Sequence, residues 1–364
     1  MGRASSEVFK PNQKLNPRNQ DQISEDLLLD LEESNPSSFI ENLIDRIKDK
    51  KSVVCMGLDP SLEGEGTIPK YLIKELGETN KNKIILEFNK SLIDNTCDLI
   101  TVIKPQIAFY ERYDALKALK KTIDYAHQKD LLVIIDSKRN DVRHTSEAWA
   151  HSTFELYNAD ACTLNAYLGY DGIEPFLKYK NKGIFILVKT SNPSSNDFQN
   201  LFSVKLEDVP KNVTEINIPG VVNIKTEENT ETLENIYYNE IELKRNYIRL
   251  AEFIKLWGTS LPKYCNYHNL GVVAGATYPQ ELLAIRKIVS NSFILMPGFG
   301  AQGATVNDIK VGFNKIGMGG IVPSSRGIIY AYKDKEEYPP DKYAEAARDE
   351  IITMNKKINK VINL

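Results

Sequence analysis

Short apolar runs recur along the chain and alternate with segments of helical period. The runs are rich in β-branched residues and lie at 52–58, 99–103, 131–135, 161–164, 183–188, 270–274, 292–296 and 316–322. None of them alternates polar with apolar positions, so we expect each to be a strand buried on both faces, as in a parallel sheet. Strands of this number, separated by helices, predict a single (β/α)8 TIM barrel of the α/β class, because a doubly wound sheet more often has about five or six.

The ends of the chain differ from this pattern. Residues 1–37 are mostly polar and interrupted by prolines, which predicts a mobile N-terminal arm, although the leucines at 27–31 could form a helical turn or two. The barrel domain is expected to span 38–364. Ser38 and Glu41 have the spacing of a capping box at the start of a helix, and 340–358 has the pattern of a final helix.

One connection is much longer than the others. Residues 192–240, after the fifth predicted strand, are rich in Asn, Glu, Thr and Ser and contain several prolines. Loops of this kind usually have about 2–6 residues. The segment leaves the C-terminal end of a barrel strand, which is the face where barrel enzymes carry their active sites. It is therefore either a disordered insertion or a partly ordered lid.

Composition and charge narrow the functional classes. The 364 residues include 46 Lys and Arg and 49 Asp and Glu, a net charge of −3, which argues against a nucleic-acid-binding protein. No apolar run approaches the roughly 18 residues of a membrane span. The four cysteines form no C-x-x-C pair, which favours free thiols in a reducing cytoplasm. The histidines lack the i, i+4 spacing of a metal pair, so we predict no metal site.

Polar residues stand where the predicted strands end. Asp59 follows the first strand and Lys104 follows the second. Asp136 and Lys138 follow the third, and Ser191 follows the fifth. In a parallel barrel the C-terminal ends of all strands meet at one mouth, so these side chains are expected to converge there.

The third strand end carries the most informative charges. Asp136 and Lys138 are two apart on an extended segment, so both can face the mouth, although a purely structural ion pair is the alternative. Asp141 either joins them or caps the following helix, a position that favours Asp. With Lys104 these residues form an array of alternating sign, in which opposite charges keep each group ionised. Protonated lysines are proton donors rather than the nucleophile of a Schiff-base aldolase.

A glycine-rich segment, 298–303, follows the seventh predicted strand and matches G-x-G-x-x-G. A dinucleotide site would instead need the first strand of a βαβ unit and an acid about 20 residues further on. The segment has the position of a barrel phosphate loop, and Arg326, after the eighth strand, could bind the same phosphate. Turn glycines beside a surface arginine are the alternative.

These residues together resemble the orotidine 5′-monophosphate decarboxylase family. The segment 136–141 matches the family's D-x-K-x-x-D signature. Further matches lie at 57–60, 104–109, 190–193, 297–302 and 325–326, in the family's order.

The resemblance implies a role for each matching residue. Lys104, Asp136, Lys138 and Asp141 would form the charged catalytic array, and Lys138 would protonate C6 of the pyrimidine as carbon dioxide leaves. Of the implied substrate-binding residues, Asp59 and Lys104 would bind the ribose, Ser191 the base, and Gln302 and Arg326 the phosphate. Ser325 is also implied to bind the substrate, without a particular group assigned to it. In the family the last Asp comes from the neighbouring subunit. Asp141 and Thr145 therefore imply a homodimer whose subunits complete each other's sites.

The implied reaction is the decarboxylation of orotidine 5′-monophosphate to uridine 5′-monophosphate, the last step of de novo synthesis of that nucleotide, with no metal or other cofactor. A nucleic acid or membrane partner is not expected. Two alternatives stay open: another phosphate-binding barrel enzyme, such as a metal-dependent one, and a barrel that binds nucleotides without turnover. Whether the chain acts alone or as half of a fused UMP synthase also stays open.

Overall fold

The computed structural model describes residues 37–64, 67–204, 235–238, 241–300 and 302–364. Ser37–Leu364 forms one compact unit. The predicted arm, except for residue 37, and most of the predicted insertion, 205–234, lie outside the described residues.

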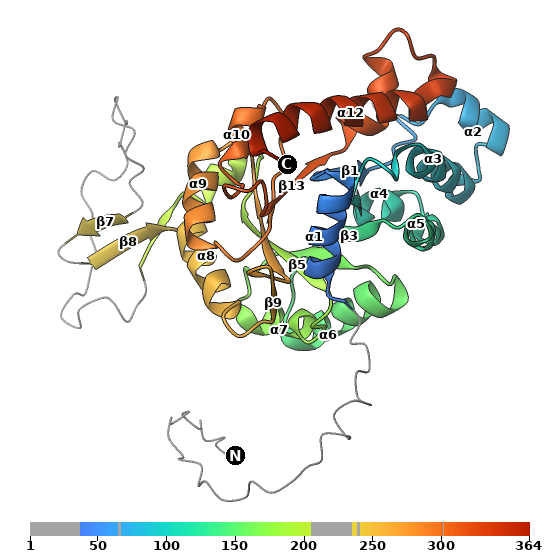
Figure 1. The fold of residues 1–364 in the computed structure, drawn as a ribbon. Coiled ribbons are helices and arrows are strands. Elements are labelled where there is room, and N and C mark those ends of the chain that lie inside the picture. Colours follow the sequence, from blue (N-terminus) through green and yellow to red (C-terminus); the bar gives the residue numbers. More distant parts are fainter. Residues whose placement is uncertain (1–36, 65–66, 205–234, 239–240, 301) are drawn as a thin grey trace, which may run out of the picture. The chain divides into compact units, whose positions relative to one another are not determined.

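A closed barrel of parallel strands forms the centre of the fold (Figure 1). In chain order its strands are β1 (Val54–Leu58), β2 (Val102–Pro105), β3 (Leu132–Arg139), β4 (Ala161–Leu164), β5 (Gly183–Lys189), β11 (Leu270–Ala274), β12 (Ile294–Leu295) and β13 (Gly320–Ser324). Each strand pairs with the next along the chain, and β1 pairs with β13 to close the ring. The predicted (β/α)8 fold is confirmed.

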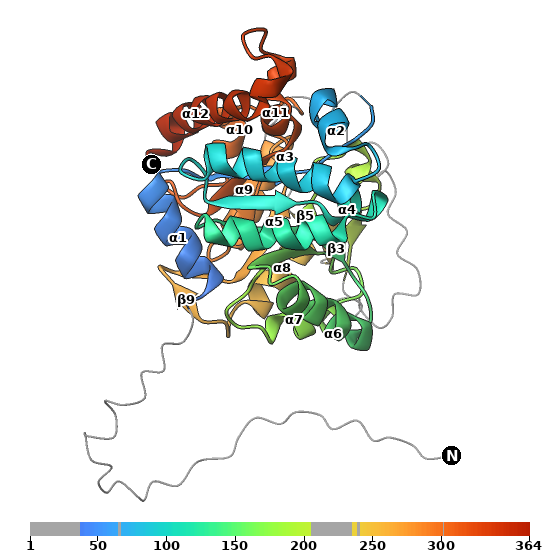
Figure 2. The same cartoon turned by 90° about the vertical axis from the view of Figure 1, so that its right-hand side faces the viewer.

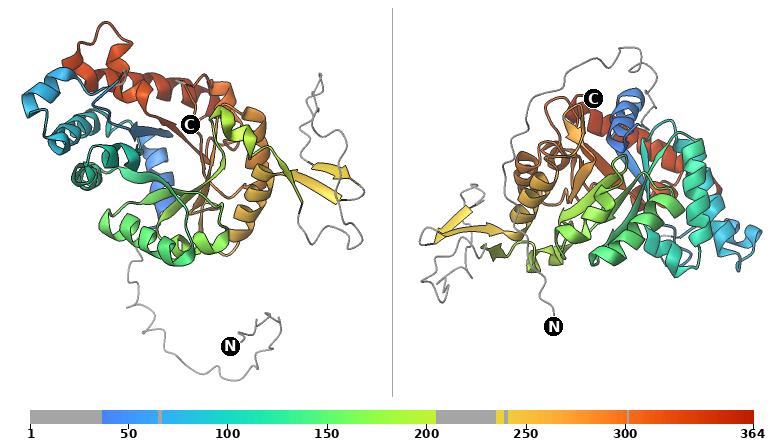
Figure 3. Two further views of the ribbon diagram at one scale, coloured as in Figure 1. Left: turned by 180° about the vertical axis from the view of Figure 1, so that it is seen from behind. Right: turned by 90° about the horizontal axis from the view of Figure 1, so that it is seen from below.

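Helices surround the strands, as Figure 3 shows. They are α1 (Phe39–Lys50), α2 (Lys70–Leu76), α3 (Lys81–Thr96), α4 (Ile107–Arg112), α5 (Leu116–Gln128), α6 (Arg143–His151), α7 (Glu174–Leu177), α8 (Asn246–Trp257), α9 (Pro279–Ile288), α10 (Val306–Lys310), α11 (Arg326–Ile329) and α12 (Tyr343–Ile362). Within the described ranges, none of them is long and apolar enough to cross a membrane.

The strand bounds differ from the predicted ones in ways that matter for the site. β13 begins at Gly320 instead of residue 316, because Gly317 and Gly319 have φ of +75° and +97° and form a turn before it. β2 runs to residue 105, so Lys104 lies within the strand rather than after it. β3 runs to residue 139, so Asp136 and Lys138 also belong to a strand.

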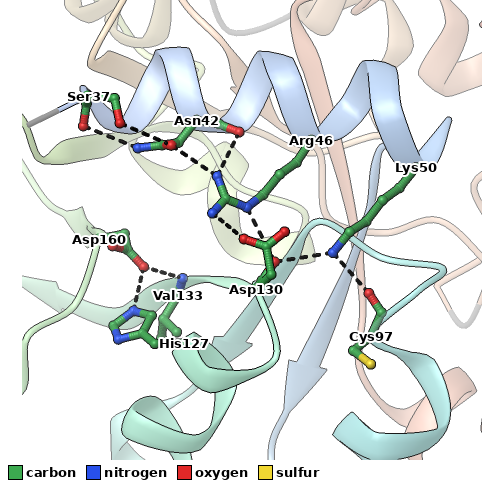
Figure 4. A network of polar contacts seen from close by, with 9 residues as sticks. All are labelled: Ser37, Asn42, Arg46, Lys50, Cys97, His127, Asp130, Val133 and Asp160. Carbon is green, nitrogen blue, oxygen red and sulfur yellow. Dashed lines mark hydrogen bonds and ion pairs between the residues drawn. The ribbon is translucent and has the colours of Figure 1, made fainter.

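The helix α1 packs at the end of the barrel where the strands begin. Ser38 caps it by accepting a hydrogen bond from the Glu41 amide. This contact is one of the two hydrogen bonds of the predicted capping box. Arg46 forms an ion pair with Asp130, just before β3, at 2.6 Å (Figure 4). Lys50 donates to the carbonyl oxygen of Cys97, at the end of α3 (Figure 4). The opposite end of the barrel, where the strands finish, is left for the site.

The C-terminal helix α12 packs beside α3 on the outside of the barrel (Figure 2). The rings of Phe88 and Tyr343 stack there with centroids 5.0 Å apart. The predicted final helix is confirmed, although it begins at Tyr343, after a 3-10 turn at Pro340–Lys342.

A small sheet joins strands within the predicted insertion to a strand that begins just after it. A 3-10 turn, Pro193–Asp197, follows β5. The strand β6 (Phe202–Ser203) then pairs antiparallel with β8 (Ile241–Arg245), which also pairs with β7 (Asn235–Tyr238). A separate short hairpin, β9 (Lys263–Tyr264) with β10 (Tyr267–His268), precedes β11.

Candidate active site

A cavity of about 770 Å³ opens where the barrel strands end. Most of the predicted site residues line it: Asp59, Lys104, Asp136, Lys138, Ser191, Gln302, Ser325 and Arg326. Side chains far apart in the sequence therefore meet in one place, because every strand of a parallel barrel ends at the same mouth.

Asp136 lies between two lysines at the bottom of this cavity. Lys104 Nζ is 2.8 Å from Asp136 Oδ2, and Lys138 Nζ is 2.5 Å from Asp136 Oδ1. The side chains of Lys104 and Asp136 are buried, whereas that of Lys138 is 43% exposed. The structure thus brings three members of the predicted array together, with Lys138 the one most open to the cavity.

The charges of this cluster support one another. Burial alone would raise the pKa of the Asp136 carboxyl, but Lys104 and Lys138 outweigh burial and hold that pKa well below its usual range. Burial would also lower the pKa of Lys104, but Asp136 and Asp59 raise it above that of a free lysine. Asp136 is therefore an anion and Lys104 a cation at neutral pH.

Asp59 offers an unused hydrogen-bond acceptor to the cavity. Its Oδ1 is buried and has no hydrogen-bond partner within the described residues. A buried polar atom left without a partner costs roughly 1–3 kcal/mol, so such an atom at a cavity wall is suited to a ligand. Tyr330 fixes the backbone beside it by donating to the Asp59 carbonyl and accepting from the Ser61 amide.

Asp141 and Thr145 do not line the cavity of their own chain. Asp141 Oδ1 accepts a hydrogen bond from the Val142 amide at 2.8 Å. The alternative interpretation of Asp141 as a helix cap is wrong, because the N-cap of α6 is Val142 and no side chain caps that helix. The fourth predicted charge is thus outside the cluster that the other three form.

The glycine-rich segment reaches the cavity from β12. Gly298 and Gly303 have φ of +112° and +91°, in the left-handed region that favours glycine. Gln302 faces the cavity from this segment, and Ser325 and Arg326 face it from the end of β13. The predicted phosphate-binding residues Gln302 and Arg326 therefore follow neighbouring strands of the barrel and line the same cavity. Residue 301 lies outside the described part of the chain.

The sequence analysis did not predict two buried polar residues beside the cavity. Thr163, on β4, donates to Asp136 Oδ1 at 2.7 Å. Lys189, at the end of β5, donates to Ser195 Oγ at 2.8 Å and to Asn196 Oδ1 at 3.0 Å. Lys189 closes an apolar run, as Lys104 does, so the same strand-end pattern could have found it. Thr163 gives no such signal, because threonine is an ordinary strand residue.

The closed barrel and its charged mouth define the class of the protein as a (β/α)8-barrel enzyme. The model of the orotidine 5′-phosphate decarboxylase / HUMPS family matches residues 52–231. The orotidine 5′-phosphate decarboxylase of Clostridium kluyveri is 37% identical over 89% of this chain and 98% of its own. The orotidine 5′-phosphate decarboxylase of Caldicellulosiruptor saccharolyticus is 35% identical over 82% of this chain and 91% of its own. The chain belongs to the orotidine 5′-phosphate decarboxylase family.

A solved structure agrees with this assignment. The OMP decarboxylase of Leishmania donovani superposes with a TM-score of 0.63 and 25% sequence identity, covering 90% of this chain and 99% of that one. The predicted family and enzyme class are confirmed.

Proposed function

We propose that this chain decarboxylates orotidine 5′-monophosphate to uridine 5′-monophosphate and carbon dioxide without a cofactor, as the last step of de novo synthesis of that nucleotide. The observation that carries the proposal is the fixed arrangement of Lys104, Asp136 and Lys138 in the cavity. The family assignment supports it.

Lys138 acts as the proton donor. The bond from C6 to the carboxylate breaks, its electron pair stays at C6, and carbon dioxide leaves. A proton passes from Lys138 Nζ to C6, and the amine regains a proton from water. An ammonium held beside C6 by Asp136 stabilises the charge where it develops, which is the electrostatic preorganisation that such a reaction needs.

The other cavity residues bind the substrate. Gln302 and Arg326 hold the phosphate, which the planar guanidinium of an arginine can bind through two hydrogen bonds, and Ser325 is a further substrate-binding residue. Asp59 and Lys104 hold the ribose hydroxyls, and the unpartnered Oδ1 of Asp59 is available for this contact. Ser191 binds the base.

A homodimer completes each site. Asp141 and Thr145 do not line the cavity of their own chain, and they cross to the cavity of the neighbouring subunit in this proposal. Large apolar side chains are exposed nearby: Val142, Tyr167, Leu168 and Tyr170. The loop that carries the last three lies against Asp141, since a side chain at Gly172 would come within 2.7 Å of the Asp141 carbonyl oxygen. An exposed apolar patch of this kind is typical of an interface.

We also propose a cytoplasmic location. All four cysteines lie within the described residues and are unpaired, which suits a reducing compartment.

The decisive experiment follows the loss of orotidine 5′-monophosphate absorbance in the presence of a chelator. Turnover is expected to persist with the chelator and to fall by at least about 10³-fold in K138A, because the proton donor is gone. K178M, on an exposed lysine, is the matched control and should retain turnover. Abolition by the chelator would favour the metal-dependent alternative, and nucleotide binding without turnover would favour a non-catalytic barrel.

The shared site has its own test. K138A and D141A are each expected to be inactive, but an equimolar mixture should regain about a quarter of the original activity. After random subunit exchange, half of all dimers contain one chain of each kind, and each of these has one intact site of two. A mixture that stays inactive after subunit exchange, or a D141A variant with full activity, would contradict the proposed crossing.

A further inference from the structure

Thr163 is a buried hydroxyl at the centre of the charged cluster. It lies on β4, is 1% exposed, and lines the cavity. Its Oγ1 donates to Asp136 Oδ1 at 2.7 Å and accepts from the backbone amides of Ser137 at 3.1 Å and Lys138 at 3.0 Å. A threonine hydroxyl has one proton to donate and two lone pairs to accept with, so all of its hydrogen-bonding capacity is used here.

The three contacts fall where β3 departs from regular pairing with β4. Ile135 lies opposite Cys162, and Arg139 lies opposite Leu164. The segment of β3 between these pairs is longer than the facing segment of β4, so β3 bulges at residues 136–138. In a bulge some amides lose their partners across the ladder, and the Thr163 hydroxyl takes up those of Ser137 and Lys138.

The bulge also explains an unusual backbone conformation. Lys138 has a φ of +49°, in the left-handed region that a residue with a Cβ seldom adopts. This conformation costs on the order of 1 kcal/mol or more, so surrounding contacts must hold it in place. The hydrogen bond from the Lys138 amide to Thr163 is such a contact, and it fixes the direction in which the lysine side chain leaves the strand.

We propose that Thr163 is a positioning residue for the decarboxylation, an inference that rests on the proposed function. Its hydroxyl fixes the Asp136 carboxylate and the Lys138 backbone to one point on β4. The ammonium of Lys138 and its anionic partner are thereby held in one geometry before the substrate arrives. Thr163 itself exchanges no proton with the substrate.

The test compares T163V, which keeps the shape but removes the hydroxyl, with T163S, which keeps the hydroxyl. Misplacing a catalytic group by about 1 Å can cost on the order of 10²-fold in rate. We therefore expect kcat for orotidine 5′-monophosphate to fall at least about tenfold in T163V and to be largely restored in T163S. The dissociation constant of uridine 5′-monophosphate should change less than about threefold, because the phosphate-binding residues are untouched.

T122V is the matched control. Thr122 is also a fully buried threonine and accepts a hydrogen bond from Asn89, but it lies on α5 away from the cavity. If buried hydroxyls mattered only for stability, T122V and T163V would both lower the melting temperature, and neither would change kcat. T163A serves as the second variant without a hydroxyl if T163V does not fold.

Amide hydrogen exchange gives a readout that does not depend on turnover. The Lys138 amide is expected to exchange at least about tenfold faster in T163V than in the unaltered chain or T163S, because its hydrogen bond is lost. Unchanged exchange, a T163V variant with full kcat, or a T163S variant as impaired as T163V would overturn the proposal. Absence of turnover in the unaltered chain would instead overturn the proposed function.

Discussion

At the scale of single residues, one carboxylate organises the site. The oxygens of Asp136 accept hydrogen bonds from Lys104, Lys138 and Thr163 within 2.8 Å. Lys104 is deeply buried, and burial alone would lower its pKa, so its charge depends on Asp136 and Asp59. The same carboxylate thus supports the fold and the proposed chemistry.

The variant D136N tests this dependence. Removing the charge leaves Lys104 as a buried cation with a weaker partner, so we expect the free energy of unfolding to fall by about 3 kcal/mol in urea titration at neutral pH. E345Q is the control, because Glu345 pairs with Lys342 on the surface, where such pairs contribute at most about 1 kcal/mol. Equal, small effects of both substitutions would contradict the expectation.

At the scale of elements, the turn after β5 is held by a lysine. Lys189 is fully buried, and its ammonium lies 4.1 Å from the centroid of the Tyr278 ring. It donates to Ser195 and Asn196, both in the 3-10 turn Pro193–Asp197, and this turn also contributes Ser194 to the cavity wall. The Lys189 side chain therefore ties the turn that borders the predicted substrate site to the end of β5.

Replacing Lys189 by methionine is expected to loosen this turn. Hydrogen bonds to charged groups contribute about 1.5–3 kcal/mol each, so K189M should raise KM for orotidine 5′-monophosphate about tenfold or more. The value of kcat should change far less, because the cluster around Asp136 is untouched. Steady-state kinetics separates the two, with K178M as the control. A fall in kcat at unchanged KM would show that the turn does not serve binding.

At the scale of the whole molecule, a buried histidine couples folding to pH. His268 lies on β10 and is 4% exposed. Burial, with a smaller contribution from the positive charge of Lys263, lowers its pKa from 6.5 to about 4. The unfolded chain therefore binds more protons than the folded one between those values, so stability falls as the pH drops through this window.

The variant H268Q should flatten this part of the stability curve. A shift of this size corresponds to ~3 kcal/mol at the acid end of the window, since one pKa unit corresponds to about 1.4 kcal/mol. We expect the unaltered chain to lose more stability than H268Q between pH 6.5 and pH 4 in urea titrations. H144Q, at an exposed histidine of α6, is the control and should follow the unaltered chain.

The sequence predicted much of the fold because buried parallel strands have a distinctive composition. Each apolar run corresponds to one strand of the barrel, and the polar residues that interrupt this pattern, such as Lys104 and Asp136, line the cavity. A charge at the end of an apolar run is conspicuous, because burying it is costly unless it has a partner. The prediction of the eighth strand was displaced because its glycines form a turn that apolarity does not reveal.

Contacts between strands were beyond the reach of the sequence. Gly57 is an example: a Cβ there would lie 1.8 Å from Ser325 Oγ, so only glycine lets β1 approach the end of β13. Thr163 is another, because its role arises from the bulge opposite it on β3. The residues next to Gly57 and Thr163 in the sequence do not reveal these contacts, because the partners lie on other strands.

The sequence by itself determined the number and order of the barrel strands and which charges stand near their ends, because burial and backbone periodicity act locally along the chain. Only the tertiary structure decided which of those charges touch. It joins Lys104, Asp136 and Lys138 and leaves Asp141 outside their cavity. The physical reason is that hydrogen bonds and ion pairs act over a few ångströms, and barrel closure, rather than sequence spacing, sets those distances.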